Sequence, residues 1–598
     1  MHVRGSGVTR GILARWAVLV LAAAFAASAA PVPAASSQGT VLFPESAIRI
    51  GMVGVGKTVL VGTRISEFQV RILGILRNGG PAGDLVLFRA SGAAISSVGG
   101  LAAGMSGSPI YLGGRLAGAF SYSLEGSDPM VGLFTPIEDM MHDLPHAVGG
   151  PAKTVAIAPV DVDGRMVRRI TVAASAAQVP SSGDGTLVAA PAATPLFVFG
   201  LGAREQEALT RFLEPMGVIP MAGGSSADLP ASLPLDPGSA IGVALMRGDI
   251  GQYAVGTVTY RDGNRILAFG HSFTNAGPSR YLLTNASILQ VVRGTARNIK
   301  VGAAGPVVGI ISEDRPAAVA GTVGMLPRVF GVRVRVTDAD TGAVRQFTFQ
   351  IVPDKTLVPT LVTLGAQGAI ERALNRSGAG TAEVRMVLRG RGIDQAIVRV
   401  NRFYSGSDIG ARALTEVPAA MQLVFDNDFA DVVPTDMDMD VRVTSHQDTA
   451  VITAADVGQR SLAPGDTIHV HVTIRPFRGD VTAKDVDLAV PATFVPGPSL
   501  LIVRAGGPGL APPLGAAAHP PDSPTPAPEA AQSLPDAITA FEQQEKNTDI
   551  VVELIGGRVA PTDSGTGADA GRPTATSTTP WVLNGRIQIP VLITGGAH

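Results

Sequence analysis

Short runs of β-branched and other apolar residues, separated by glycines, recur along most of this chain. Two clear cases are Val-Arg-Val-Arg-Val at 332–336 and the alternating stretch at 467–474. Such runs are typical of strands, and the 72 glycines and 44 prolines among 598 residues favour the tight turns that join strands. The sequence therefore predicts a mainly β fold.

Length and charge limit the number of domains and the classes of ligand. A chain of 598 residues is too long for one hydrophobic core, so we expect roughly three or four domains. Its 47 basic and 49 acidic residues leave a formal net charge of -2, which creates no field to gather nucleic acid. The chain has no cysteine, so its fold must depend on apolar burial without disulfides. We expect no nucleic acid among its partners.

The N-terminal 30 residues have the pattern of a secretory signal peptide. Basic residues (Arg4, Arg10 and Arg15) precede an apolar run at 16–27, and small residues follow at 27–29. An uncleaved membrane anchor is the alternative, but the run is shorter than the roughly 20 residues that span a bilayer. We therefore expect export to the periplasm, the cell envelope or the extracellular space, with peripheral envelope association as an option.

A serine lies in a glycine-rich turn between two strand-like runs. The motif is Gly104-Met105-Ser106-Gly107-Ser108-Pro109, and the run Ile110-Tyr111-Leu112 follows it. A nucleophilic serine needs a tight turn whose backbone N–H groups point at a developing oxyanion, and glycines permit that geometry. By analogy with serine hydrolases, the amides of Gly104 and Ser106 would form the oxyanion hole. Such a turn also occurs in ordinary hairpins, so the motif requires a partner base.

His271 is the candidate base. It follows the run Ile266-Leu267-Ala268-Phe269 and Gly270, where a strand opens into a polar loop. A neutral imidazole at this place can take the serine proton and return it to the leaving amine. The competing interpretation is a histidine at a sheet edge that makes an ordinary hydrogen bond.

Taken together, these segments resemble the SpoIVB family of sporulation serine peptidases. The resemblance covers about a third of the chain, in two stretches around Ser106 and His271. The first adds Gly99-Gly100, 114–119 and 135–140, and the second adds 256–260, 311–315 and 321–324. It implies a trypsin-like two-barrel peptidase in which Ser106 is the nucleophile and His271 the base.

Two features depart from that family. Its histidine segment precedes its serine segment, whereas here Ser106 comes first, so the order is circularly permuted. The position that matches the family's acid is Ser91, which carries no charge. Asp314, in the His-bearing half, is the first substitute and Asp84 the second, and the absence of any acid stays open. The chain also shows no PDZ-like module.

These observations predict the organisation of the whole chain. Residues 203–213 form a predicted helix inside an Ala/Pro/Gly-rich segment, and residues 256–269 form a predicted hairpin with its turn at 261–264. A helix is predicted near 535–545 and strands at 550–555 and 587–593. The predicted parts are a signal peptide (1–30), a Ser-bearing half (40–145), a connector (146–235), a His-bearing half (236–328), a β-sandwich-like domain (329–504), a Pro/Ala-rich linker (505–532) and C-terminal strands (533–598).

Two other motifs suggest ligands. The stretch 51–58, Gly-Met-Val-Gly-Val-Gly-Lys-Thr, matches the phosphate loop of nucleotide hydrolases. That loop requires a helix to begin at Lys57, but the residues after it are β-branched, so we expect no nucleotide. His469 and His471 share a strand face without a third metal ligand, and the aspartates at 436, 438 and 440 lack the glycine of a calcium loop. We expect no metal and no cofactor.

The leading functional hypothesis is an exported serine endopeptidase that hydrolyses peptide bonds through an acyl-enzyme on Ser106. Its site residues are Ser106, His271 and Asp314, with Gly104 and Ser106 as the oxyanion hole. The alternative is a non-catalytic, peptidase-like envelope protein that binds peptides or protein partners. The separation of Ser106 Oγ from His271 Nε2, and the presence of a carboxylate on Nδ1, distinguish the two.

Overall fold

A computed structural model describes residues 40–142, 153–162, 164–173, 185–192, 194–224, 228–294, 297–507, 531–556 and 572–595. The expected signal peptide and most of the expected linker at 505–532 lie outside these residues. The chain divides into two units, Met1–Val41 and Leu42–His598, and the described helices and strands all lie in the second. No helix among the described residues has the length and apolar character needed to cross a membrane.

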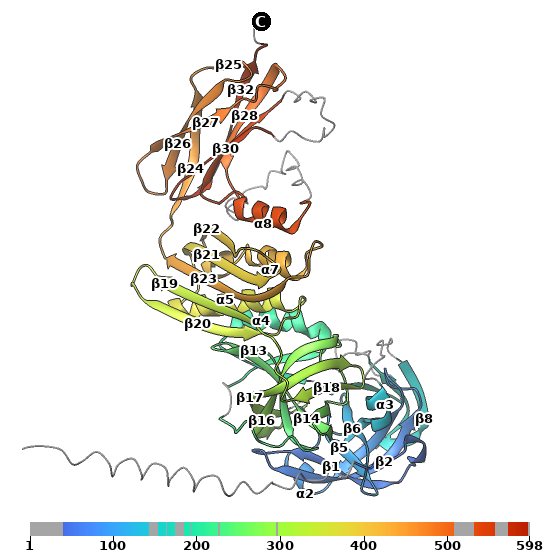
Figure 1. Cartoon of the computed structure of the whole chain (residues 1–598). Coiled ribbons are helices and arrows are strands. Elements are labelled where there is room, and N and C mark those ends of the chain that lie inside the picture. The colour runs from blue at the N-terminus through green and yellow to red at the C-terminus, as the bar shows by residue number, and fades with distance from the viewer. Residues whose placement is uncertain are drawn as a thin grey trace, which may run out of the picture. The chain divides into compact units, whose positions relative to one another are not determined.

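The protein is mainly β, as predicted. Strands account for 53% and helices for 14%, and the sheets include a six-stranded β-barrel and curled half-barrels. Figure 1 shows the strands of the N-terminal part in blue and those of the next part in green.

The first sheet closes on itself around the segment that carries Ser106. Strand pairing runs β5-β1-β2-β3-β7-β6 and returns from β6 to β5. The strands are β1 (Val53–Val59), β2 (Ile65–Leu76), β3 (Leu85–Ser91), β5 (Pro109–Leu112), β6 (Arg115–Leu124) and β7 (Val131–Pro136). Alternate residues of β2, including Phe68, Val70 and Ile72, point inward and form the core with Phe88, Phe120 and Phe134. We call these six strands the Ser-bearing barrel.

A second closed cycle of pairings surrounds the segment that carries His271. It runs β14-β15-β18-β17-β16-β13 and returns from β13 to β14. The strands are β13 (Ala240–Gly248), β14 (Gly251–Asp262), β15 (Arg265–Ala268), β16 (Gly277–Val292), β17 (Asn298–Arg315) and β18 (Ala318–Val323). The predicted hairpin is confirmed as β14 and β15, where Asp262 pairs with Arg265 around Gly263. We call these six strands the His-bearing cycle.

The segment expected to be a connector adds strands to both sheets. Strands β8 (Lys153–Val162), β9 (Arg165–Val172) and β10 (Thr186–Pro191) extend the sheet of the Ser-bearing barrel. Strands β11 (Thr194–Phe199) and β12 (Val218–Ala222) extend the sheet of the His-bearing cycle. The predicted helix is confirmed as α4 (Ala203–Leu213), which buries Leu209 and Leu213. The compositional bias of this segment therefore conceals ordinary sheet structure.

Residues 329–504 differ from the single sandwich expected there. Strands β19 (Phe330–Asp338), β20 (Val344–Ile351), β21 (Gly380–Arg391), β22 (Ile397–Ser405) and β23 (Val433–Thr444) continue the second sheet. Helices α5 (Val358–Leu374) and α7 (Val417–Phe425) share their hydrophobic core. Two separate sheets begin only at β24 (Thr449–Val457).

The two later sheets share one apolar core. One has the order β27-β26-β24-β31 and the other β25-β32-β28-β29-β30. Their remaining strands are β25 (Ser461–Leu462), β26 (Thr467–Pro476), β27 (Thr482–Ala489), β28 (Gly497–Ala505), β29 (Asp549–Ile555), β30 (Thr574–Thr578), β31 (Val582–Asn584) and β32 (Arg586–Ile593). The predicted helix near 535–545 is present as α8 (Leu534–Gln543), and the predicted C-terminal strands are β29 and β32.

Candidate functional site

Ser106 lies in a short loop between β4 (Ala102–Ala103) and β5. Gly104 and Gly107 have φ values of 88° and 89°, a region that residues with a Cβ rarely adopt. A Cβ on Gly107 would lie 2.1 Å from the carbonyl oxygen of Thr257 and 2.4 Å from the amide of Phe269. Only glycine fits there, and the close approach brings the Ser106 loop directly against β14 and β15.

The backbone donors of this loop fall into two groups. Met105 N donates to Ala102 O, Gly107 N to Phe120 O and Ser108 N to Met105 O. The hydrogen bonds found among the described residues include none donated by Gly104 N or Ser106 N. These are the two amides that the sequence predicts for the oxyanion hole, so both are unoccupied donors.

The loop that carries His271 is anchored on the Ser-bearing barrel. Phe269 and Gly270 both have a φ of 71°, and the positive value at Phe269 costs about 1–2 kcal/mol. A Cβ on Gly270 would lie 3.1 Å from Ser121 Cβ. Thr135 Oγ1, on β7, donates to Gly270 O at 2.8 Å. A strained turn in one half of the molecule is thus held by the other half.

Strand β14 makes hydrogen bonds to the backbone of the Ser106 loop. Thr257 N donates to Ser106 O at 3.0 Å, and Thr259 Oγ1 donates to Gly107 O at 2.8 Å. The residues joined by the second bond are 152 positions apart in the chain. The Ser106 loop and the strand that leads toward His271, far apart in the chain, therefore pack against each other.

Ser106 and His271 each keep one reactive atom without a partner. Ser106 is 0% exposed and His271 is 2% exposed, and neither Ser106 Oγ nor His271 Nε2 makes a hydrogen bond. They are therefore not hydrogen-bonded to each other in this structure. A buried polar atom without a partner is rare in folded proteins and requires an explanation such as a catalytic role.

The other ring nitrogen fixes the form of His271. Nδ1 lies 2.6 Å from the carbonyl oxygen of Ser272, so Nδ1 carries the proton and Nε2 has the lone pair. Burial lowers the pKa of His271 to about 4, and the carbonyls of Ser272 and Ala192 act in the opposite direction. The imidazole is thus neutral at pH 7.

Asp314 is buried beside this loop, but its carboxylate does not accept from His271 Nδ1, as the expected triad acid would. Its carboxylate accepts the amides of Phe273 and Thr274, each at 2.7 Å, and the hydroxyl of Thr274 at 2.9 Å. Burial raises the pKa of Asp314, and these hydrogen bonds oppose that rise. Asp314 therefore fastens the backbone just after Ser272, whose carbonyl is the group that faces the ring.

The other two positions considered for the acid lie elsewhere. Asp84 accepts from Arg77 Nη1 and from Asn78 N in the turn between β2 and β3. Ser91 is exposed at the end of β3 and lines an open groove of about 790 Å³. Among the hydrogen bonds and ion pairs of the described residues, none joins Asp84 or Ser91 to His271.

The sequence indicated no role for four residues that surround the site: Thr135, Thr257, Thr259 and Lys300. Thr257 and Thr259 are fully buried on β14, where they alternate with Val258. Lys300 is fully buried on β17 and donates to Thr58 Oγ1 at 3.3 Å and Thr257 Oγ1 at 3.1 Å. The available signal was a single lysine inside the strand-like run 298–311.

The phosphate-loop motif has a different structural role. Lys57 lies in strand β1, where its ammonium is 3.3 Å from Glu67 Oε1 and 5.3 Å from the ring centre of Tyr111. The helix N-terminus that would hold phosphate is therefore missing at this position.

The polar residues considered for metals are engaged with other side chains. His469 and His471 each place Nδ1 2.7 Å from an aspartate on β27, Asp487 and Asp485 respectively. Asp436 and Asp438 accept from Arg389. Within the described ranges no group of three or more potential metal ligands occurs.

Comparisons with protein-family models, curated proteins and solved structures find no match for this chain.

Proposed function

We propose that this chain is an exported serine endopeptidase of the SpoIVB-like type, with a permuted, trypsin-like two-barrel domain followed by a sandwich-like domain. Two closed cycles of six strands, with the Ser106 loop from one against the His271 loop from the other, support that architecture. Trypsin-like sites are defined by the geometry of the groups rather than by their order in the chain.

A single observation carries the proposal: Ser106 Oγ and His271 Nε2 are both buried and both lack a hydrogen-bond partner. In the proposed reaction, Oγ bonds to the substrate carbonyl carbon and its proton passes to Nε2. The amides of Gly104 and Ser106 stabilise the resulting oxyanion. Nε2 then gives the proton to the leaving amine as the C–N bond breaks, and water hydrolyses the acyl-enzyme.

The proposed resting state is closed. With Ser106 at 0% exposure, a substrate carbonyl reaches Oγ only after the two loops separate. Such an opening also brings water to Nε2, which raises the pKa of His271 toward the usual value for histidine because burial is what lowers it. Opening and activation are therefore one event in this proposal.

A fluorophosphonate probe tests the nucleophile. The serine oxygen displaces fluoride from phosphorus, so we expect covalent labelling of the mature protein at Ser106. Ser106→Ala should lose the label, and its rate of cleavage of an unfolded protein substrate should fall by at least about 10³-fold. Ser108→Ala is the matched control, because Ser108 lies in the same loop but its hydroxyl already donates to Met105 O at 2.6 Å. Equal labelling of wild type and Ser106→Ala would refute the proposal.

The second candidate function is a non-catalytic peptide-binding envelope protein. The observation in its favour is that His271 Nδ1 faces a carbonyl rather than a carboxylate, since loss of the acid reduces turnover by about 10⁴-fold in a triad enzyme. This function predicts an unlabelled wild type that binds unfolded peptides as tightly as Ser106→Ala does, by calorimetry.

A further inference from the structure

Lys300 is a buried cation without an anion. It is 0% exposed, and the ion pairs among the described residues include none to its ammonium. Its two hydrogen bonds go to neutral hydroxyls, those of Thr58 and Thr257. A buried lysine is normally paired with a carboxylate, because desolvation of an isolated charge is unfavourable. Its retention at this place therefore suggests a use for the charge.

The lysine lies against Gly104, the residue whose N–H supplies half of the proposed oxyanion hole. A Cβ on Gly104 would lie 3.2 Å from Lys300 Cβ, so the stem of the lysine packs on the Gly104 backbone. Thr257 Oγ1 accepts from Lys300 Nζ and makes a long hydrogen bond of 3.5 Å to Gly104 O. A chain of hydrogen bonds thus runs from Lys300 through Thr257 to Gly104.

The same ammonium joins the two halves of the site. Thr58 belongs to β1 of the Ser-bearing barrel, whereas Thr257 and Lys300 belong to β14 and β17 of the His-bearing cycle. Lys300 therefore bridges the two halves directly behind the Ser106 loop.

We propose that Lys300 is a positioning residue that acts through the hydroxyl of Thr257 on Gly104 O, and so orients the residue whose N–H belongs to the proposed oxyanion hole. This inference rests on the proposed function. An ammonium only donates, so Thr257 Oγ1 must accept from it and its own hydrogen is directed to Gly104 O. A neutral amine also accepts, which frees the Thr257 hydrogen to turn away. The charge on Lys300 thus sets the direction of the whole chain of hydrogen bonds.

Because Lys300 can lose its proton, this chain of hydrogen bonds is sensitive to pH. Burial lowers the pKa of Lys300 to about 7, and no neighbouring charge contributes to that shift. The charged or titratable residues on the strands packed against it are Lys57 on β1, Tyr253, Tyr260, Arg261 and Asp262 on β14, and Arg280 and Tyr281 on β16. Its own strand β17 adds Glu313, Asp314 and Arg315. The ammonium form predominates below pH 7 and the amine form above it.

The rate constant for fluorophosphonate labelling tests the inference at pH 6.5. Lys300→Met should slow labelling about tenfold, because one oxyanion donor that is lost entirely is worth 10²–10³. Thr257→Val should slow it equally, Thr257→Ser should keep the wild-type rate, and the double variant Lys300→Met with Thr257→Val should be no slower than either single variant. Thr58→Val, which removes the ammonium's other acceptor but no contact with Gly104, should stay within about threefold of wild type.

The pH profile provides a readout that loss of packing alone would not change. In the wild type, labelling should rise as His271 deprotonates near pH 4 and fall above about pH 7 as Lys300 loses its proton. Lys300→Met should keep the first limb and lose the second.

The outcomes separate the two proposals. If the wild type is labelled and Lys300→Met shows the same rate and pH profile, the inference is overturned and the proposed function is left intact. If Lys300→Met does not fold, Thr257→Val serves for the same comparison. A wild type that is never labelled overturns the proposed function, and the inference with it.

Discussion

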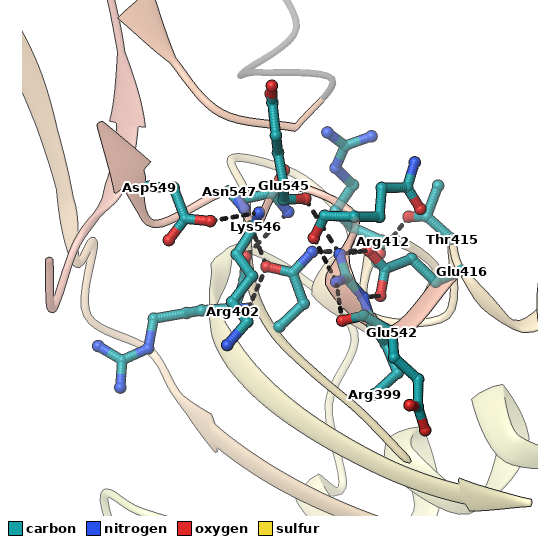
Figure 2. A network of polar contacts seen from close by, with 12 residues as sticks. Arg399, Arg402, Arg412, Thr415, Glu416, Glu542, Glu545, Lys546, Asn547 and Asp549 are labelled. Atoms are coloured by element: carbon teal, nitrogen blue, oxygen red, sulfur yellow. Dashed lines mark hydrogen bonds and ion pairs between the residues drawn. The ribbon is translucent and has the colours of Figure 1, made fainter. Parts of the chain in front are cut away.

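Two of the lysines and arginines that the structure describes are buried, and they have opposite kinds of partners. Arg399, on β22, is 1% exposed, and Lys300, on β17, is 0% exposed. Figure 2 shows Arg399 among the side chains and carbonyls around it. Its Nε and Nη2 donate to the two carboxylate oxygens of Glu416, at 3.0 Å and 2.8 Å. Its remaining N–H groups donate to the carbonyls of Glu542, Gln544 and Glu545. All five donors of the guanidinium are therefore used.

The difference shows which buried charge stabilises the fold and which serves a site. Arg399 joins β22 to the segment between α8 and β29, and no hydrogen-bonding capacity is left for a ligand. Lys300 has two hydroxyl partners, no anion, and a place beside the proposed oxyanion loop. Replacing a fully paired buried cation strongly destabilises the fold, because its partners lose their donor. An unpaired buried cation itself lowers the stability of the fold that contains it.

The largest effect is expected from Arg399→Met. The substitution removes the donor of three carbonyls and leaves the Glu416 carboxylate with Asn401 Nδ2 but without its cation, so we expect a loss of about 3–5 kcal/mol in the free energy of unfolding. Urea denaturation measures it. Arg402→Met, on the same strand, is the matched control, because Arg402 is 26% exposed and should lose only about 1 kcal/mol. Equal losses in the two variants would contradict the contrast between the buried and the exposed arginine.

Lys300→Met should change stability in the opposite direction. The folded pKa of Lys300, about 7, lies below the usual value for lysine, so between pH 7 and roughly 10 the unfolded chain binds a proton that the folded chain does not. Wild-type stability therefore rises with pH in this window, and the unfavourable buried charge is fully present below it. We expect Lys300→Met to gain about 1–3 kcal/mol at pH 6 and progressively less toward pH 10. Denaturation at both values measures the gain, and a loss at pH 6 would contradict it.

The smallest effect is expected from an exposed cation. Lys57 and Glu67 face each other across β1 and β2 with side-chain exposures of 36% and 61%. Lys57→Met should change the free energy of unfolding by less than about 1 kcal/mol, and salt should weaken what remains. A loss as large as that of Arg399→Met would show that burial is not what separates these cations.

Much of the local structure could be predicted from the sequence. The hairpin of β14 and β15, helix α4 and the C-terminal strands follow from alternation, turn residues and a helical face, all of which short segments contain. Ser106 and His271 were selected as candidates because the segments around them resemble a family of serine peptidases, and the glycines beside them mark turns of unusual backbone conformation. The strands β8–β12 were hidden by a composition rich in Ala, Pro and Gly.

The sequence by itself determined that this chain is mainly β, because periodicity and glycine placement act over a few residues. It also predicted, by resemblance, the two loops around Ser106 and His271 as places for a nucleophile and a base. Only the tertiary structure decided which groups surround those loops. Lys300 donates to Thr58, which is 242 positions away in the sequence. Asp314 accepts from the amide of Phe273, 41 positions away, and not from the imidazole of His271. The physical reason is that strand pairing and the closure of the sheets are non-local, and they assign each buried polar group its partner.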